Sequence, residues 1–244
     1  MPAATGSSPA RGRSGSPDSA GGRRRSRAAP GRPPGAAGSE EAILDAARAL
    51  FLQAGYDGVN LERLAAHAGL SRQTLYNRFG SKEAIFRAML ARHWARLTDA
   101  PFMRAPREAV GEKAPAAVLE DLAGIILRFI EDRRQVDFTR LVIAESHRLP
   151  WIAEEFYRLG KAPLVQALAT CIDEMARRGQ IDCPDTALAA HQFLGLLQEF
   201  VFWPKVMAIG AGNARLPPPE RAVAESVRMF LCRYGQERGG ASGT

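Results

Sequence analysis

The chain has 244 residues, 46% of them hydrophobic, which gives room for one or two domains with a sizeable buried core. No apolar run reaches the ~18 residues of a membrane-spanning helix, and the start carries no apolar segment of a secretory signal, so we expect a cytoplasmic protein without a membrane span. The formal net charge of +7 is compatible with a nucleic-acid partner, and its distribution shows where that charge lies.

Residues 1–38 form a basic segment built from Gly, Pro, Ser, Ala and Arg. The segment holds seven arginines and one aspartate, so six of the seven net positive charges lie here and the rest of the chain is almost neutral. Because it contains almost no large apolar side chain to offset the entropy of ordering, we predict a disordered tail. The cluster at 23–27 is either simply solvated or contacts phosphates as a mobile arm, and the sequence leaves both open.

The first predicted helix follows Ser39, which is a suitable N-cap. Glu40 and Glu41 occupy the first turn, where the helix dipole favours negative charge. Gly55 ends the helix as a C′ residue. Between these ends the apolar residues have the spacing of an amphipathic helix, at Ile43, Ala46, Ala47, Leu50, Phe51 and Ala54.

Two short helices separated by a glycine come next and predict a helix-turn-helix over about 60–79. Asn60 is suited to cap the first helix, Gly69 breaks it, and Ser71 is suited to cap the second. In the second helix Leu75 and Phe79 face inward. The outward positions form a polar face of Arg72, Gln73, Asn77 and Arg78. Ser81 then caps a further helix with an apolar stripe.

Beyond Pro101 the pattern changes to longer helices, and strand-like alternation persists nowhere, so the predicted class is all-α. Pro and Gly residues punctuate these helices. We place them at about 115–131, 133–148, 151–159, 162–178, 185–208 and 218–234. The last two carry broad apolar faces, at Leu188, Phe193, Leu196, Leu197 and Val201, and at Val223, Val227, Phe230 and Leu231.

Two stretches resemble the TetR family of transcriptional regulators. The first runs from Ile43 to Tyr56, and the second is carried by Leu64, Ala65, Ala68, Gly69, Leu70, Ser71, Thr74, Leu75, Tyr76, Phe79, Lys82, Glu83 and Phe86. The resemblance implies a DNA-binding head at 39–98, a connecting fourth helix, an effector and dimerisation body at 99–236, and a flexible end at 237–244. Residues 140–150, with Phe156 and Tyr157, also resemble one subgroup's effector domain.

The outward face of the helix at 72–79 is the expected DNA reader. Arg suits guanine and Gln or Asn suits adenine in the major groove, so Arg72, Gln73, Asn77 and Arg78 are the predicted base-reading residues. Family members often have His at position 78, which leaves the role of the Arg here open. The predicted phosphate contacts are Ser71, Thr74, Tyr76, Lys82 and Arg63, of which the resemblance supports Tyr76 and Lys82.

A small-molecule effector of unknown identity is expected in the body, because a binding cavity there needs an apolar lining with a few polar groups. Suggested lining residues are Phe129, Phe138, Trp151, Phe156, His191 and Phe200. In this family the last two helices pair with their twofold mates, so the resemblance implies a homodimer through about 185–208 and 218–234. A palindromic double-stranded DNA operator requires such a twofold protein.

The predicted function is therefore a ligand-responsive repressor. An alternative is an activator or DNA-binding adaptor whose body binds a protein, and a remote one is an all-helical enzyme. We expect no enzyme, since G-x-S-x-G, Walker, H-E-x-x-H and G-x-G-x-x-G motifs are missing. We also expect no cofactor or metal, because neither the four histidines nor the three cysteines have metal-ligand spacing.

Overall fold

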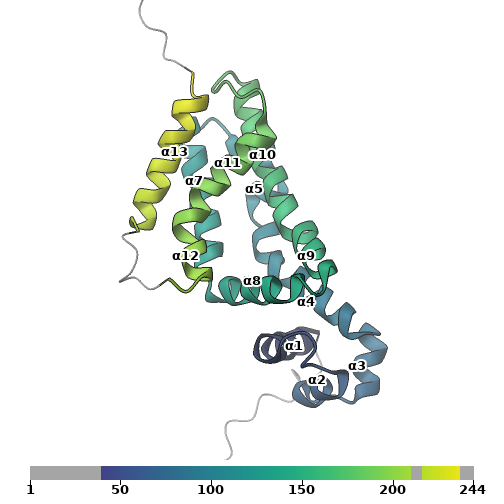
Figure 1. The fold of residues 1–244 in the computed structure, drawn as a ribbon. Coiled ribbons are helices and arrows are strands. Elements are labelled where there is room, and N and C mark those ends of the chain that lie inside the picture. Colours follow the sequence, from purple (N-terminus) through teal and green to yellow (C-terminus); the bar gives the residue numbers. More distant parts are fainter. Residues whose placement is uncertain (1–39, 210–215, 237–244) are drawn as a thin grey trace, which may run out of the picture. The chain divides into compact units, whose positions relative to one another are not determined.

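The computed structural model describes residues 40–209 and 216–236, and each regular element within them is a helix (Figure 1). This confirms the predicted all-α class. The predicted tails 1–38 and 237–244 and the Ser39 cap lie outside the described residues. Within the described part, no helix is long and apolar enough to span a bilayer. The elements in chain order are α1 (Glu40–Ala54), α2 (Leu61–Ala68), α3 (Arg72–Phe79), α4 (Lys82–Thr98), α5 (Pro101–Arg104), α6 (Pro106–Val110), α7 (Pro115–Glu131), α8 (Arg133–Ser146), α9 (Pro150–Phe156), the π-helix Tyr157–Lys161, α10 (Ala162–Arg177), α11 (Thr186–Val201), α12 (Trp203–Val206) and α13 (Pro219–Tyr234).

Side-chain caps and glycines set the ends of the first helices, as predicted. Asn60, Ser71 and Ser81 each accept a hydrogen bond from the backbone N–H three residues on, so α2, α3 and α4 begin where their caps place them. Left-handed or related positive φ angles, which suit residues without a Cβ, end the preceding elements at Gly55, Gly69 and Gly80. The bounds of the helix-turn-helix are therefore fixed by local chemistry.

The later helices differ from the prediction in three places. Two short helices, α5 and α6, begin at prolines and were not predicted. The predicted helix 185–208 is interrupted at Phe202, because Pro204 lacks the N–H that would continue it and its ring crowds the preceding turn. Gly160 ends no helix: α9 passes through the π-helix directly into α10.

The buried apolar residues form two clusters. The larger one joins α7, α10, α11 and α13 with the end of α4, around residues such as Leu119, Leu168 and Phe193. The smaller one holds the core of α1–α4. It also takes in four residues from α8 and α9, namely Phe138, Leu141, Val142 and Ile152. The head therefore packs on α8 and α9, through α1 and α4, as well as on itself.

Candidate DNA-reading helix and effector cavity

One buried residue and one cap hold α3, the second helix of the helix-turn-helix, in place. Leu75 is fully buried and anchors the inner side of the helix. At its start, Ser71 Oγ accepts from the Thr74 N–H at 3.0 Å and lies 2.8 Å from Thr74 Oγ1. Both hydroxyls therefore stabilise the first turn of α3, where recognition helices usually approach base edges.

The outer side of α3 is exposed and polar, and its side chains already have partners. Arg72 forms an ion pair with Glu62 of α2, with a nitrogen–oxygen distance of 2.8 Å. Gln73 Nε2 donates to Asn77 Oδ1, also at 2.8 Å. Such contacts in water contribute little to stability. The groups that make them are therefore available to exchange these partners for base edges at small cost.

The predicted phosphate contacts differ in exposure and in partners. Tyr76 is 55% exposed on α3. Arg63 is also exposed, and it donates to the carbonyl of Gly58 at 3.0 Å and to Gln53 Oε1 at 3.4 Å. Lys82 is partly buried.

Two contacts bind Lys82 to the loop that follows α1. Its Nζ donates to the Tyr56 carbonyl at 3.0 Å and lies 4.2 Å from the centre of the Tyr56 ring. The structure thus gives Lys82 a role in holding this loop that the sequence did not predict.

A carboxylate from α8 joins the body to the same loop. Glu145 Oε1 accepts from the Tyr56 N–H at 2.9 Å, and its other oxygen accepts from Arg148 at 2.7 Å. Arg148 also pairs with Asp57. The φ of 67° at Gly55 favours glycine, and a Cβ there would also lie 2.6 Å from Glu145 Oε1 and displace this carboxylate.

An aromatic group fills the joint between α4 and α9. Phe86 makes edge contacts with Phe51, Tyr56 and Trp151, at centroid separations of 5.0–5.7 Å. Arg87 lies over the Trp151 ring and pairs with the buried Glu155 at 2.9 Å. A hydrogen bond from Arg158, with help from Arg87, lowers the pKa of Glu155.

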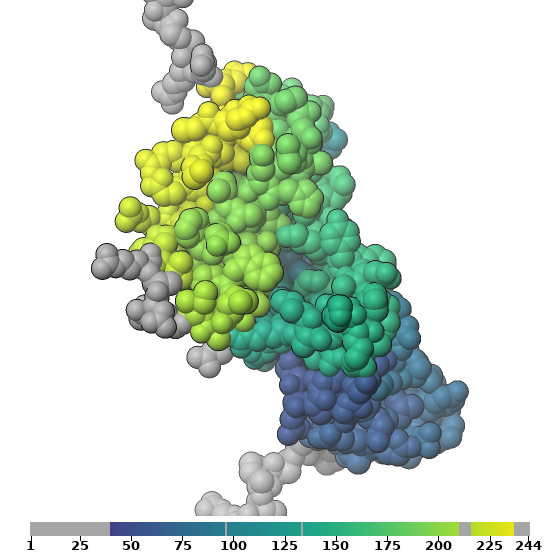
Figure 2. Space-filling view, viewed as in Figure 1, coloured from purple at the N-terminus to yellow at the C-terminus, as the bar shows by residue number. Residues whose placement is uncertain are grey.

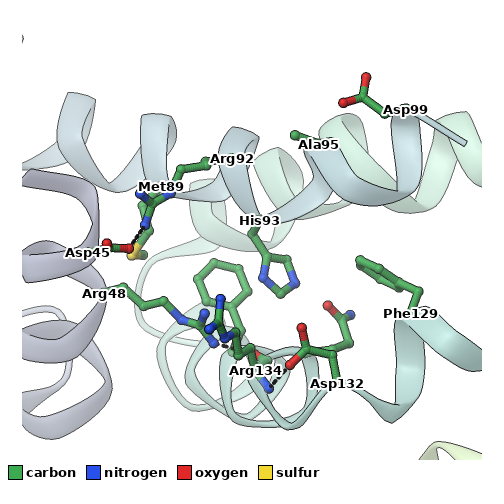
Figure 3. A pocket seen from close by; sticks show the side chains of 12 residues that line it. Asp45, Arg48, Met89, Arg92, His93, Ala95, Asp99, Phe129, Asp132 and Arg134 are labelled. Carbon is green, nitrogen blue, oxygen red and sulfur yellow. Dashed lines mark hydrogen bonds and ion pairs between the residues drawn. The ribbon is translucent and has the colours of Figure 1, made fainter. Parts of the chain in front are cut away.

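A polar pocket of about 330 Å³ lies where α1, α4 and the α7–α8 turn meet (Figure 3). Figure 3 shows His93 pointing from α4 into this space, with Arg48 of α1 and Arg134 of α8 beside it. The His93 ring stacks on Phe138, with centroids 4.0 Å apart, and its Nε2 has no hydrogen-bond partner. Burial lowers the pKa of His93 to about 4.

A second cavity, of about 430 Å³, lies in the body and is mostly apolar. Helices α4, α7, α8, α9, α10, α11 and α12 and the π-helix line it. Its polar members include Gln135, Lys161 and Gln198. Trp94 Nε1 and Gln135 Oε1 are both buried without a hydrogen-bond partner. Its size and lining are those of a small-molecule site.

Of the six residues suggested as lining, Phe129 and Phe156 line this cavity and four lie elsewhere. Phe138 faces the polar pocket, and Trp151 packs on Tyr56 and Phe86. His191 and Phe200 are exposed on α11, because the apolar side of that helix faces α10 and α13. The sequence missed Trp94, Gln135 and Lys161, since only the packing of distant helices brings them together.

Helices α11 and α13 lie side by side and form one surface, green and yellow in Figure 2. Several residues of the apolar faces predicted to pair across the twofold axis are instead buried within the chain, namely Phe193, Leu197, Val201, Val227 and Phe230. The apolar side chains that this pair of helices does expose include Leu188, Phe200 and Met229. A groove lined by residues such as Leu196 and Tyr234 runs between the two helices.

Two family models match the chain. Residues 43–89 match the model for bacterial regulatory proteins of the tetR family, and residues 117–236 match the C-terminal domain of AefR-like transcriptional repressors. The chain is 26% identical over 158 residues to the HTH-type transcriptional repressor AcnR of Corynebacterium glutamicum, covering 64% of this chain and 76% of that protein.

Solved structures agree over most of the chain. A TetR-family regulator from Mesorhizobium loti matches with a TM-score of 0.68 and 29% identity, covering 81% of this chain and 96% of that one. The flavonoid-responsive regulator FrrA matches with a TM-score of 0.65 and 28% identity, covering 81% and 97%. These relatives are described as transcriptional repressors or regulators. The capped helix-turn-helix, the all-helical body and both family models lead to one assignment: the chain belongs to the TetR family and is a DNA-binding transcriptional regulator.

Proposed function

We propose that this protein is a repressor that binds a palindromic operator as a homodimer and is released by a small-molecule effector. The observation that carries the proposal is the exposed polar face of α3, held by Leu75 and the Ser71 cap in the position of a recognition helix. Its work takes place in the cytoplasm, on the nucleoid. The head at 39–98 and the body at 99–236 divide the two tasks.

Base reading falls to the first turn of α3 and the turn after it. Arg72 leaves Glu62 for a guanine edge, and Gln73 leaves Asn77 for an adenine edge, since both bidentate pairings suit the major groove. Asn77 and Arg78, one turn on, contact bases or phosphates. Tyr76, Ser71 and Thr74 donate to the phosphate backbone and fix the register.

The dimer forms through α11 and α13. The exposed apolar side chains Leu188, Phe200 and Met229 on these helices support this surface, because an exposed apolar patch of this kind commonly marks an interface. A twofold axis through it presents two copies of α3 to half-sites one helical turn apart.

Effector control runs through α4. This helix contributes Ile85 and Phe86 to the core of the head and Trp94 to the wall of the apolar cavity. An effector that binds better to one position of α4 than to another shifts the equilibrium toward that position and changes the spacing of the two heads. Glu145 of α8 joins the body to the loop after α1, and Arg87 of α4 pairs with Glu155 of α9.

The test is selection of bound sequences from a random DNA pool, followed by footprinting of the wild type, Arg72→Ala and Arg104→Ala. The last is the matched control, an equally exposed arginine of α5 paired with Asp99. We expect a twofold-symmetric footprint, a loss of about 1–3 kcal/mol of binding free energy for Arg72→Ala, and none for the control. Sequence-indifferent binding, or equal loss in both variants, would contradict the proposal.

A further inference from the structure

The π-helix Tyr157–Lys161 brings one cation to the wall of the apolar cavity. Single π-turns inside helices are rare and frequently mark functional sites. Lys161, its last residue, is partly buried, and its Nζ donates to Gln198 Oε1 at 3.3 Å. Within the described ranges 40–209 and 216–236 no carboxylate pairs with it. Burial lowers the pKa of Lys161.

The rest of the cavity lining, as far as the structure describes it, carries no charge that could balance Lys161. Of the seventeen described residues around the cavity, Lys161 is the charged one, and none is Asp or Glu. The others are mainly apolar or aromatic, such as Phe129, Phe156 and Trp203. Trp94 Nε1 adds a second hydrogen-bond donor that is buried without an acceptor. The described lining therefore carries one positive charge without an opposite one and one buried donor, Trp94 Nε1, without an acceptor.

Buried charges and donors without partners are costly, and proteins rarely keep them unless a ligand completes them. A cationic ligand would be repelled by Lys161, and a purely apolar one would leave the Lys161 charge unbalanced and Trp94 Nε1 without an acceptor. A carboxylate supplies the opposite charge and accepts strong charge-assisted hydrogen bonds. The volume of about 430 Å³ leaves room for an apolar skeleton beside it.

We propose that the effector of this cavity is a small apolar carboxylic acid, bound as the anion, with its carboxylate on Lys161 and its skeleton among the aromatic side chains. This inference rests on the proposed ligand response and names the chemical class that produces it. It applies equally to an aromatic and to an aliphatic acid, because both carry the same head group.

The same π-helix also reaches α4. A Cβ on Gly160 would lie 1.8–2.3 Å from three atoms of the Trp94 indole ring, so the ring packs directly on the glycine backbone. A carboxylate that draws Lys161 into the cavity moves the residue next to Gly160. Because Trp94 belongs to α4, this contact passes the movement to the helix that carries the head.

The experiment uses matched acids and amides on the full-length protein. The probes are 2-naphthoate with 2-naphthamide and decanoate with decanamide, with affinity measured by isothermal titration calorimetry. The proteins are the wild type, Lys161→Met, Lys161→Arg and Lys205→Met. Lys205→Met is the control, because it removes the same charge from an exposed side chain outside this cavity.

We expect at least one acid to bind the wild type and Lys161→Met to weaken it about 10- to 100-fold. The amide affinity should stay unchanged, Lys161→Arg should restore part of the acid affinity, and the control should match the wild type. Thermal unfolding should show that Lys161→Met is folded, since removing an unpaired partly buried cation costs little stability.

Three outcomes would overturn the proposal: an acid no better than its amide, an acid affinity that does not depend on Lys161, or no binding of either acid at millimolar concentration. None of these would affect operator selection by the unliganded protein, so a failure here is distinct from a failure of the repressor proposal. The acid that binds also identifies the type of effector: binding of 2-naphthoate indicates an aromatic acid, and binding of decanoate indicates an aliphatic one.

Discussion

The head and the body begin their helices in different ways. In the head, Asn60, Ser71 and Ser81 cap α2, α3 and α4 through side-chain hydrogen bonds. In the body, seven helices start with proline in the first turn and no side-chain cap, and α8 and α11 have aspartate caps. A cap fixes a helix end through a bond in the folded state, whereas proline acts largely by restricting the unfolded chain.

The two regions also differ in packing. Phe51 and Phe86 in the core of the head are fully buried and in mutual contact. The body encloses a cavity beside Trp94 and Gln135, whose polar atoms have no partner. The proposed reading helix needs a fixed angle, and the proposed effector needs space. The core of the head is filled, whereas the body contains a cavity.

The largest expected effect tests this difference in packing. Phe86→Ala should lower the free energy of unfolding by about 3–5 kcal/mol, because its contacts with three other rings leave no room for relaxation. Phe129→Ala should cost about 2 kcal/mol or less, since one side of that ring already faces the cavity. Urea unfolding measures both. Equal losses of unfolding free energy in the two variants would refute the difference in packing between the head and the body.

The next prediction concerns pH at the boundary between the two regions. Burial holds the pKa of His93 at about 4, well below its ordinary value, so the unfolded chain takes up a proton there before the folded one does. Arg48, Asp132 and Gln135 surround the ring. Stability from this residue is complete above about pH 6.5 and falls by up to about 3 kcal/mol as the pH drops to 4.

Urea unfolding between pH 4.5 and 7.5 measures this effect. His93→Phe removes the titrating group and keeps a ring against Phe138, so its stability should vary less with pH than that of the wild type. His191→Gln, an exposed replacement on α11, is the control and should keep the slope of the wild type. Identical slopes in all three proteins would rule out His93 as the source.

A third prediction concerns the hydrogen bond from the Tyr56 N–H to Glu145, which joins the head to the body. Glu145→Ala should lower the free energy of unfolding by about 1–3 kcal/mol, because the partly buried Tyr56 N–H loses its acceptor. Glu154→Ala, on the exposed side of α9, should cost about 0.5 kcal/mol or less. Chemical unfolding compares the two, and hydrogen exchange at Tyr56 should rise in the first variant alone. Protection at Tyr56 that survives Glu145→Ala would contradict the assigned bond.

The smallest effect concerns the helix starts themselves. Ser71→Ala should cost about 1 kcal/mol and weaken DNA binding as well, because the first turn of α3 loses its cap. Pro150→Ala at the start of α9 should cost about 0.4–1 kcal/mol, mainly through the unfolded chain, and leave DNA binding unchanged. Melting temperature and operator affinity together separate them. A weaker operator complex with Pro150→Ala would show that the two kinds of helix start are equivalent in function.

The sequence predicted the head better than the body for a physical reason. Caps such as Ser71 and glycines such as Gly69 act on residues three or four positions away, so their effect can be predicted from the neighbouring sequence. The break at Phe202 also had a local signal, in Pro204, that the hydrophobic pattern obscured.

The cavity had no such local signal. Trp94, Lys161 and Gln198 meet through the packing of three helices that are far apart in the chain. The π-turn likewise leaves no pattern, since Gly160 is there because Trp94 packs on it. Periodicity identifies which face of a helix is apolar, but it does not show which of these apolar residues line a cavity.

The hydrophobic cluster shared by α1–α4 with α8 and α9 bears on how the molecule can be divided. Cutting the chain after α4 would uncover the side of the head that rests on Phe138, Leu141, Val142 and Ile152. An excised head should therefore aggregate or melt, and a chimera that transplants it to another regulator should work only if α8 and α9 travel with it. The unit to transfer in engineering is therefore the head together with α8 and α9, on which it packs.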